Sequence, residues 1–354
     1  MSDLVRGLAL GDLDYDLPGE LIAQTPADPR DSSRLLVRRR DAGTLEDRSF
    51  AELPTLLRDG DVLVRNDTRV FPARSFFHRA TGGRIEVLFL SSLSGPSAGS
   101  ERWEALLRGR PRREEVLENE TLGPEWPLRC VEPLGDGRWV VENLGGETVL
   151  ALLEGAGVTP LPPYITAPLE DPERYQTTYA RRPGSAAAPT AGLHFTPALD
   201  TALAAAGVAV ESVTLHVGLG TFKPLQEESL DAATLHSEAF AVEAAVWARL
   251  CEARRDGRRI VAVGTTSMRV LEHLALSEAA ADGGDLRGDT RLFIRPGFVF
   301  RMVGGLVTNF HLPRTSLLAL VMAFCGVEGT REIYRHAVRE RYRFYSFGDA
   351  MLAL

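Results

Sequence analysis

The stretch RIVAVGTTSMRVLEHLAL, residues 259–276, decides the fold class. Arg259 to Val263 is a short apolar run, which predicts a buried strand, and Met268 to Leu276 is predicted as a helix. Thr265-Thr266-Ser267 stand between them, so hydroxyls and free backbone N–H groups are expected at a strand-to-helix turn. Ligands of α/β proteins usually bind at such a turn.

The same alternation continues along the C-terminal part of the chain. Helical stretches such as Pro197 to Ala206 and Thr330 to Arg341 alternate with apolar strands such as Val208 to Val217. This pattern predicts an α/β domain. The N-terminal residues 1–61 are too short to fold alone, so we expect them to join this domain.

Residues 62–153 read instead as short strands broken by turn residues. Ile85 to Leu90 predicts one strand. Leu128 to Leu134 and Arg138 to Leu144 predict a hairpin around Gly135-Asp136-Gly137, because glycine tolerates the positive φ of a tight turn. We therefore expect an α/β main domain, residues 1–61 plus 154–354, with an inserted all-β, barrel-like domain at 62–153.

Composition excludes several classes of protein. The 354 residues are 44% hydrophobic and 25% charged, with a net charge of −8, which is typical of a globular chain of two domains. Cys130, Cys251 and Cys325 lie far apart, which argues against a disulfide scaffold or a cysteine zinc site and fits a cytoplasmic protein. The longest apolar run, residues 317–327, is about half of the ~20 residues that span a bilayer, so no membrane association is expected.

The commonest catalytic motifs are missing from the sequence. No H-E-x-x-H pattern occurs, so we expect no metal site. Gly218-Leu219-Gly220 begins like a dinucleotide fingerprint, but Lys223 stands where the third glycine belongs. Neither a G-x-S-x-G nucleophile elbow nor a P-loop is present, which removes the commonest hydrolase and NTPase interpretations.

Three histidines lie in blocks rich in glycine, threonine and proline. His194 lies in residues 188–196, His216 in residues 214–222 and His311 in residues 308–313. Such segments let backbone and hydroxyl groups approach a ligand closely, and histidine transfers protons near neutral pH. The alternative for any one of them is a turn cap or a partner for a buried carbonyl.

Arginines also cluster locally despite the negative net charge. One cluster follows the predicted strands of the inserted domain, and another lies near the C-terminus between aromatic residues. Each cluster is either a set of phosphate contacts or a set of surface ion pairs. The candidates for phosphate contacts are Arg108, Arg110, Arg112, Arg113, Arg341 and Arg343.

Many long motifs in one order carry a family resemblance. They are the three histidine blocks, Asn66-Asp67-Thr68-Arg69-Val70 with Pro72-Ala73-Arg74, Leu161 to Ile165, Tyr175 to Ala180, Gly264 to Ser267 with Arg269, and Tyr345 to Met351. The chain resembles the S-adenosylmethionine:tRNA ribosyltransferase-isomerase family of queuosine biosynthesis along nearly its whole length. The resemblance implies an α/β main domain with an inserted β-barrel domain.

The resemblance also implies a reaction. The family transfers and isomerises the ribosyl group of S-adenosylmethionine onto 7-aminomethyl-7-deazaguanine at the wobble position of tRNA. Adenine and methionine leave, and the product is epoxyqueuosine-tRNA. S-adenosylmethionine is a substrate, so no cofactor is implied, and a monomer is expected. The alternatives are a noncatalytic tRNA- or nucleoside-binding protein and a tRNA methyltransferase.

The site residues implied are those of the matching motifs. The catalytic candidates are His194, ranked first as the base, His216, His311 and Asp349. If histidine is not the base, Asp67, Glu238 and Asp349 are the next candidates. A sulfonium favours an aromatic face or a carboxylate, and the candidates to face it are Phe195, Phe222, Tyr164 and Asp349. With tRNA as the implied partner, the clustered arginines become the candidates for tRNA binding. The candidates for substrate binding are Asn66, Asp67, Arg69, Arg74, Tyr164, Thr190, Phe195, Gly218, Gly220, Thr221, Phe222, Thr265, Thr266, Ser267, Arg269 and Asn309.

Overall fold

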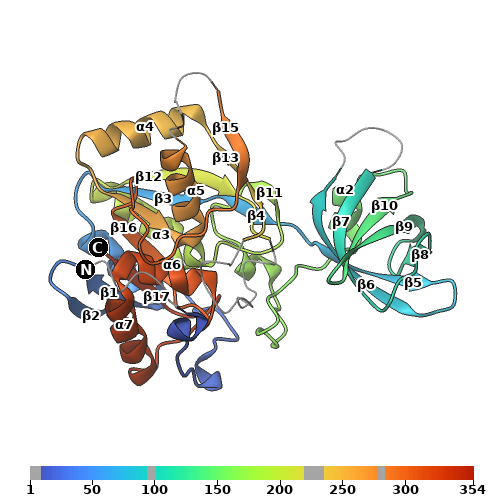
Figure 1. The fold of residues 1–354 in the computed structure, drawn as a ribbon, viewed down its shortest axis with the longest axis horizontal. Coiled ribbons are helices and arrows are strands. Elements are labelled where there is room, and N and C mark those ends of the chain that lie inside the picture. The colour runs from blue at the N-terminus through green and yellow to red at the C-terminus, as the bar shows by residue number, and fades with distance from the viewer. Residues whose placement is uncertain (1–8, 94–100, 219–234, 278, 280–283) are drawn as a thin grey trace. The chain divides into compact units, whose positions relative to one another are not determined.

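The computed structural model describes residues 9–93, 101–218, 235–277, 279 and 284–354. The chain divides into two compact units (Figure 1). The first comprises Met1–Thr68, Pro163–Arg182 and Ala188–Leu354, and the second comprises Arg69–Pro162 and Pro183–Ala187. The N-terminal residues belong to the first unit, as expected.

The first unit is built on a mixed sheet, which contains nine strands among the described residues. Their order is β15–β13–β12–β3–β14–β16–β17–β1–β2. The bounds are β1 Arg34–Arg39, β2 Thr44–Ser49, β3 Val62–Asn66, β12 Ala209–Leu215, β13 Glu238–Val242, β14 Ile260–Val263, β15 Leu286–Thr290, β16 Gly305–Asn309 and β17 Ala350–Ala353. The neighbouring strands β12, β3, β14 and β16 are parallel, so their carboxyl ends meet at one edge of the sheet.

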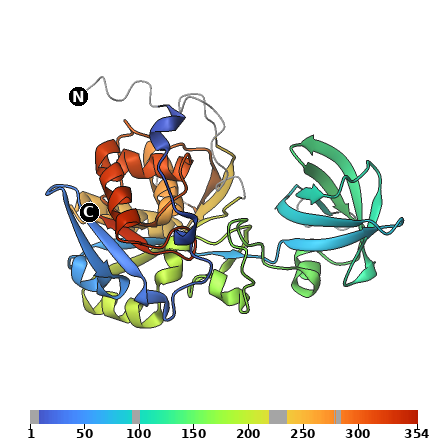
Figure 2. The same ribbon diagram turned by 90° about the horizontal axis from the view of Figure 1, so that it is seen from below.

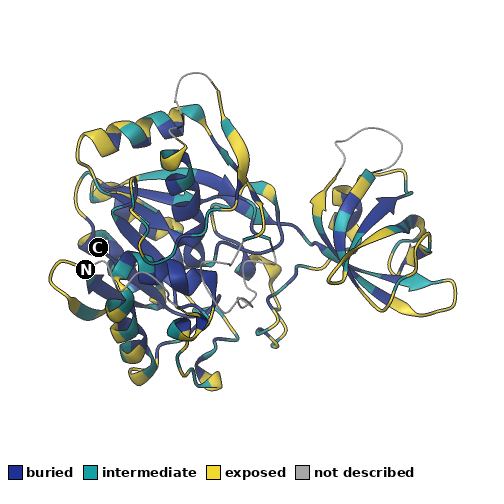
Figure 3. Ribbon diagram, viewed as in Figure 1, coloured by how far each residue is buried: buried dark blue, intermediate teal, exposed yellow. Residues whose placement is uncertain are grey.

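Helices cover both faces of this sheet (Figure 2). On one face, α1 (Leu53–Leu56) and α3 (Pro197–Ala205) pack on alternate strand residues such as Leu63 and Val261. The intervening strand residues face the other way, where α5 (Gly264–Leu276) packs against the four parallel strands. The central strands β3, β14, β16, β17 and β1 are largely buried, whereas the outer strands β2 and β15 are more exposed (Figure 3). The other α-helices in the described part of this unit are α4 Ala244–Arg255, α6 Ser316–Cys325 and α7 Val327–Arg339.

The second unit contains a closed barrel in the order β10–β7–β6–β5–β8–β9. Its strands are β5 Arg74–Arg79, β6 Arg84–Ser92, β7 Glu101–Arg108, β8 Val116–Asn119, β9 Gly123–Gly135 and β10 Arg138–Asn143, and α2 is Val149–Ala156. Trp126 fills the interior, stacked on Phe89 and edge-on to Phe77. The predicted hairpin is present, with positive φ at Gly135 and Gly137. The short strands β4 (Thr68–Val70) and β11 (Arg182–Ser185) pair with each other.

The predicted fold class is confirmed, but the predicted start of the inserted domain at residue 62 is wrong. Strand β3 begins there, and it pairs in parallel with β12 and β14 inside the main sheet. Its side chains are buried on both faces at Val62, Leu63 and Val64, as in other parallel strands. Proximity in sequence to the barrel strands hid this, because the partners of β3 lie about 150 and 200 residues further along the chain.

None of the helices in the described part of the chain is long and apolar enough to cross a membrane.

Candidate active site

A pocket lies where the parallel strands of the main sheet end. It is lined by residues within two positions of the ends of β12, β14 and β16, including Val217, Gly264 and Phe310. About 600 Å³ of empty space lies in it, part of it open to solvent. The position is the one that an open α/β sheet favours for ligands.

Helix α5 brings hydroxyls to this pocket. Gly264 begins the helix with φ of +86°, a left-handed conformation that disfavours any side chain. Val263 before it provides no capping side chain, so the first N–H groups of the helix are left for water or a ligand. Thr265 and Thr266 both line the pocket, as the sequence of the strand-to-helix turn predicted.

Two tyrosines line the pocket together. The rings of Tyr164 and Tyr345 have centroids 4.7 Å apart. The Tyr164 hydroxyl lies 2.7 Å from Ser346 Oγ, and burial raises the pKa of Tyr164 to about 12. Both side chains therefore stay neutral near pH 7 and offer aromatic surface to a cation or a nucleobase.

His311 is the histidine that lines the pocket. Its Nε2 lies 2.8 Å from Thr308 Oγ1. Its backbone is held by two tyrosines, since Tyr334 Oη accepts from the His311 N–H (2.9 Å) and Tyr15 donates to its carbonyl (2.5 Å). Burial lowers the pKa of His311 to about 3, so the imidazole is neutral near pH 7.

Two further pocket residues connect to a second buried histidine. Thr190 donates to Asn309 Oδ1 (3.0 Å), and Asn309 Nδ2 lies 3.2 Å from His194 Nε2. His194 Nδ1 lies 2.8 Å from Ser33 Oγ, and the ring stacks on Phe50. Burial lowers the pKa of His194 to about 3, with a smaller effect of Arg343 in the same direction.

The family whose description is queuosine biosynthesis protein matches residues 10–353. The S-adenosylmethionine:tRNA ribosyltransferase-isomerase of Rubrobacter xylanophilus is 50% identical over 97% of each chain. That of Moorella thermoacetica is 48% identical over 98% of this chain and 100% of its own. The crystal structure of S-adenosylmethionine tRNA ribosyltransferase from Thermotoga maritima covers 97% of this chain at 36% identity, with a TM-score of 0.55.

The chain belongs to the queuosine biosynthesis protein family. The resemblance inferred from its motifs is thereby confirmed. The fold of a solved relative covers both units.

The structure brings six of the residues implied by the family motifs together in the pocket. They are Tyr164, Thr190, Thr265, Thr266, Asn309 and His311. They come from segments up to 147 residues apart in sequence, between Tyr164 and His311. Gly220, Thr221 and Phe222 lie outside the described residues.

The three carboxylates considered as bases are engaged elsewhere. Asp67 accepts from Thr214 Oγ1 and pairs with Arg181, beside a separate polar hollow. Glu238 forms a buried ion pair with Arg269, one of the predicted substrate ligands. None of the three carboxylates lines the pocket.

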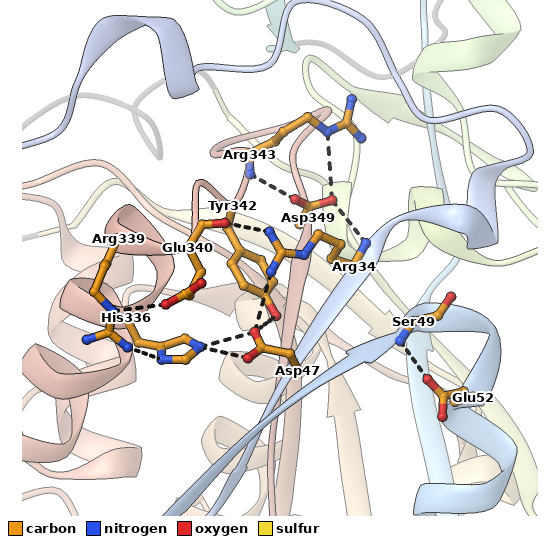
Figure 4. Close-up of polar contacts among 10 residues, drawn as sticks. All are labelled: Arg34, Asp47, Ser49, Glu52, His336, Arg339, Glu340, Tyr342, Arg343 and Asp349. Atoms are coloured by element: carbon orange, nitrogen blue, oxygen red, sulfur yellow. Dashed lines mark hydrogen bonds and ion pairs between the residues drawn. The ribbon is translucent and has the colours of Figure 1, made fainter.

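Asp349 is a clamp between two backbone segments (Figure 4). Its carboxylate accepts the N–H groups of Arg34 (3.0 Å) and Arg343 (2.8 Å) and also lies near the Arg343 guanidinium. This joins β1 to the turn before β17. A role as the sulfonium's counter-ion, expected from the sequence, is not supported by this geometry.

Five other predicted residues do not line the pocket and bond or pack within the protein. Phe195 lies in the hydrophobic core, and the Ser267 hydroxyl donates to the Val263 carbonyl. His216 Nδ1 lies 2.8 Å from Thr68 Oγ1, and the Gly218 N–H donates to Glu238. The fifth, Asn66, is fully buried and bonded to backbone groups and to Thr266. His194 is likewise one residue removed from the pocket, because Asn309 stands between them.

Arg69 and Arg74 belong to the second unit. Arg74 starts barrel strand β5, where its backbone pairs with Val158 and its guanidinium lies 3.2 Å from Glu86. A role of these two arginines in substrate binding stays a prediction.

Sequence reasoning missed Ser33 and gave Tyr345 no role. Tyr345 has a φ of +71°, unusual for a residue with a side chain, and it faces Tyr164. Ser33 lies 161 residues from His194 in sequence. No local pattern marks such a partner, because the contact exists only once the chain has folded.

The two buried histidines should make folding stability depend on pH. An imidazole titrates near pH 6.5 in the unfolded chain, whereas the pKa is about 3 in the folded protein. The unfolded state therefore binds more protons between these values, and stability is lost as the pH falls from 6.5 toward 3. From pH 7 to pH 5 each histidine should account for a loss of about 2 kcal/mol.

Chemical denaturation at the two pH values measures this effect. His194→Gln and His311→Gln should each lose about 2 kcal/mol less than the unchanged protein over the interval. His236→Gln, at an exposed histidine, should lose as much as the unchanged protein. Equal losses in all four proteins would contradict the neutral burial of the two imidazoles.

Proposed function

We propose that this protein transfers and isomerises the ribosyl group of S-adenosylmethionine onto 7-aminomethyl-7-deazaguanine in tRNA, with release of adenine and methionine. The observation that carries the proposal is near-half identity over 97–98% of the chain to enzymes named for this activity. S-adenosylmethionine is then a substrate, and no further cofactor is required.

The pocket suits the donor. Tyr164 and Tyr345 offer aromatic faces to a sulfonium or to adenine, while Thr265 and the free N–H groups of α5 suit its polar atoms. The reaction needs a base for the proton on the sugar 5′ carbon, which the sulfonium acidifies. It also needs a proton donor for the departing adenine, before methionine leaves as the epoxide closes.

We assign the base to His311 in place of His194. His311 lines the pocket, whereas His194 is reached only through Asn309. Its Nε2 is engaged with Thr308, and its lowered pKa keeps the ring unprotonated while making it a weaker base than a free imidazole. The same low pKa favours return of an accepted proton to a leaving group.

The products distinguish this function from its rivals. The protein would be incubated with S-adenosylmethionine and an anticodon stem-loop carrying 7-aminomethyl-7-deazaguanine. Adenine and methionine should appear in equal amounts as the RNA gains mass. S-adenosylhomocysteine would instead identify a methyltransferase, and unchanged S-adenosylmethionine with bound RNA would identify a noncatalytic binding protein.

Replacement of His311 by glutamine should lower kcat by roughly 10²- to 10⁴-fold, because an amide cannot take a proton. His336→Gln, outside the pocket on α7, should keep the unchanged rate. A base with a pKa of about 3 is already deprotonated above pH 5, so kcat/KM should show no acid limb from this group between pH 5 and 8. A limb near pH 6.5 would assign the base to another residue.

The arginines considered for tRNA binding fall into two groups. Arg110, Arg112 and Arg113 are exposed on the loop between β7 and β8, and no acidic side chain pairs with their guanidinium groups among the described residues. Arg108 is also exposed, 3.9 Å from Glu86. By contrast, Arg341 pairs with Glu20, and Arg343 lies near Asp349 and donates to the Thr25 carbonyl.

The loop between β7 and β8, which we call the barrel loop, is also fixed in one conformation by hydrogen bonds. Cys130 bonds the backbone of Glu114 and Glu115, and the Arg79 guanidinium bonds the Arg110 carbonyl and the Glu115 carboxylate. A pre-shaped loop loses little conformational freedom on binding a polyanion. We therefore assign the phosphate contacts to the barrel loop rather than to the C-terminal arginines.

Arg110→Ala and Arg112→Ala should weaken tRNA binding, and each should reduce the slope of log K against log salt by about 1. Arg341→Ala, which removes an arginine already paired with Glu20, should change the slope less. Filter binding or fluorescence anisotropy over a salt series measures both. A slope that responds only to Arg341 would move the tRNA surface to the C-terminal cluster.

A further inference from the structure

A line of hydrogen bonds leads from the pocket to a buried serine. Thr190 lines the pocket and donates its hydroxyl proton to Asn309 Oδ1 (3.0 Å). Asn309 Nδ2 lies 3.2 Å from His194 Nε2, and His194 Nδ1 lies 2.8 Å from Ser33 Oγ. Ser33, His194 and Asn309 are each at most 4% exposed, so these bonds form away from water.

The orientation of the Asn309 amide sets the direction of donation. An amide NH2 group donates and cannot accept, so His194 Nε2 must be unprotonated. A neutral imidazole then has its proton on Nδ1, which donates to Ser33 Oγ. Burial lowers the pKa of His194 and so favours this neutral ring. Stacking on Phe50, with centroids 4.8 Å apart, holds the ring plane.

The direction of these hydrogen bonds determines whether Thr190 donates or accepts at the pocket. The Thr190 hydroxyl donates its only proton to Asn309, so only the lone pairs of its oxygen are available to a ligand. We propose that Ser33, His194 and Asn309 are positioning residues that hold Thr190 as a hydrogen-bond acceptor, and that the group of S-adenosylmethionine resting on it is an N–H or O–H donor. The identity of this ligand rests on the proposed function.

Ser33 supports this polarity from the far end. Without its hydroxyl, the Nδ1 proton of His194 would be a buried donor with no partner, which is costly. The proton would move to Nε2, and the Asn309 amide would have to turn its oxygen toward the ring. Thr190 would then accept from the amide and present a proton to the pocket, against a ligand donor.

The tautomer of His194 is the first test, and it needs no catalysis. Nitrogen-15 NMR of the full chain with labelled histidine should find the His194 proton on Nδ1 near pH 7. Ser33→Ala should move it to Nε2. Ser32→Ala is the matched control, because the Ser32 hydroxyl is exposed and bonds only the Pro29 carbonyl, and it should leave the proton on Nδ1. A proton on Nε2 in the unchanged protein would overturn the proposal.

Binding of S-adenosylmethionine is the second test. Thr190→Val should raise the calorimetric Kd by about tenfold, the effect of one lost hydrogen bond. Thr190→Ser keeps the hydroxyl and should bind with the Kd of the unchanged protein. Ser33→Ala should raise the Kd similarly although Ser33 does not line the pocket, while Ser32→Ala should not. An unchanged Kd in Thr190→Val, or no binding by the unchanged protein, would overturn the donor assignment.

The two proposals can fail separately. Donor binding that responds to Thr190 and Ser33 without any release of adenine would refute the proposed reaction and leave the role of Ser33, His194 and Asn309 standing. Release of adenine with a Kd that ignores Thr190 would do the reverse.

Discussion

The amide of Asn66 joins the elements on which the pocket depends. Its Oδ1 accepts the N–H groups of Thr68 and Leu215, and its Nδ2 donates to the Leu215 carbonyl and to Thr266 Oγ1. These four bonds saturate the side chain and tie the ends of β3 and β12 to the first turn of α5. Since Asn66 is fully buried, losing any of them would leave an unpaired polar group away from water. Its apparent role as a substrate ligand is thus replaced by that of a scaffold for Thr266.

His194 and His311 share the same charge state but differ in their access to the pocket. His194 and His311 are both neutral because the pocket region excludes water from their rings. His311 borders the pocket, while His194 has protein partners at both ring nitrogens. A histidine with both nitrogens engaged orients its neighbours, and one at a pocket wall can exchange a proton with a ligand. Similar sequence motifs therefore surround two histidines with different roles, one that orients its neighbours and one that borders the pocket.

The arginines also differ from one another, in whether a carboxylate neutralises them. The chain has a net charge of −8, and many arginines in the described part of the first unit pair with carboxylates, as Arg259 does with Asp61 and Arg269 with Glu238. The network around Asp47 is an example, since its carboxylate accepts from Tyr342 and lies near Arg34 and His336 (Figure 4). The unpaired guanidinium groups of the β7–β8 loop stand out against that background. An unpaired guanidinium that binds a phosphate releases a counterion without first breaking an ion pair, so it adds more to the affinity for RNA than a paired one.

The sequence by itself determined the α/β class, the β-rich insertion, the strand-to-helix turn at Thr265 and Thr266, and the family. These follow from local periodicity, turn chemistry and ordered motifs, which are all short-range properties of the chain. Only the tertiary structure decided that β3 belongs to the main sheet, that His311 rather than His194 borders the pocket, and that Ser33 is the partner of His194. Each of these depends on contacts between segments more than 100 residues apart. Spacing along the chain carries no information about such contacts, because burial and hydrogen-bond partners arise only when distant strands are packed together.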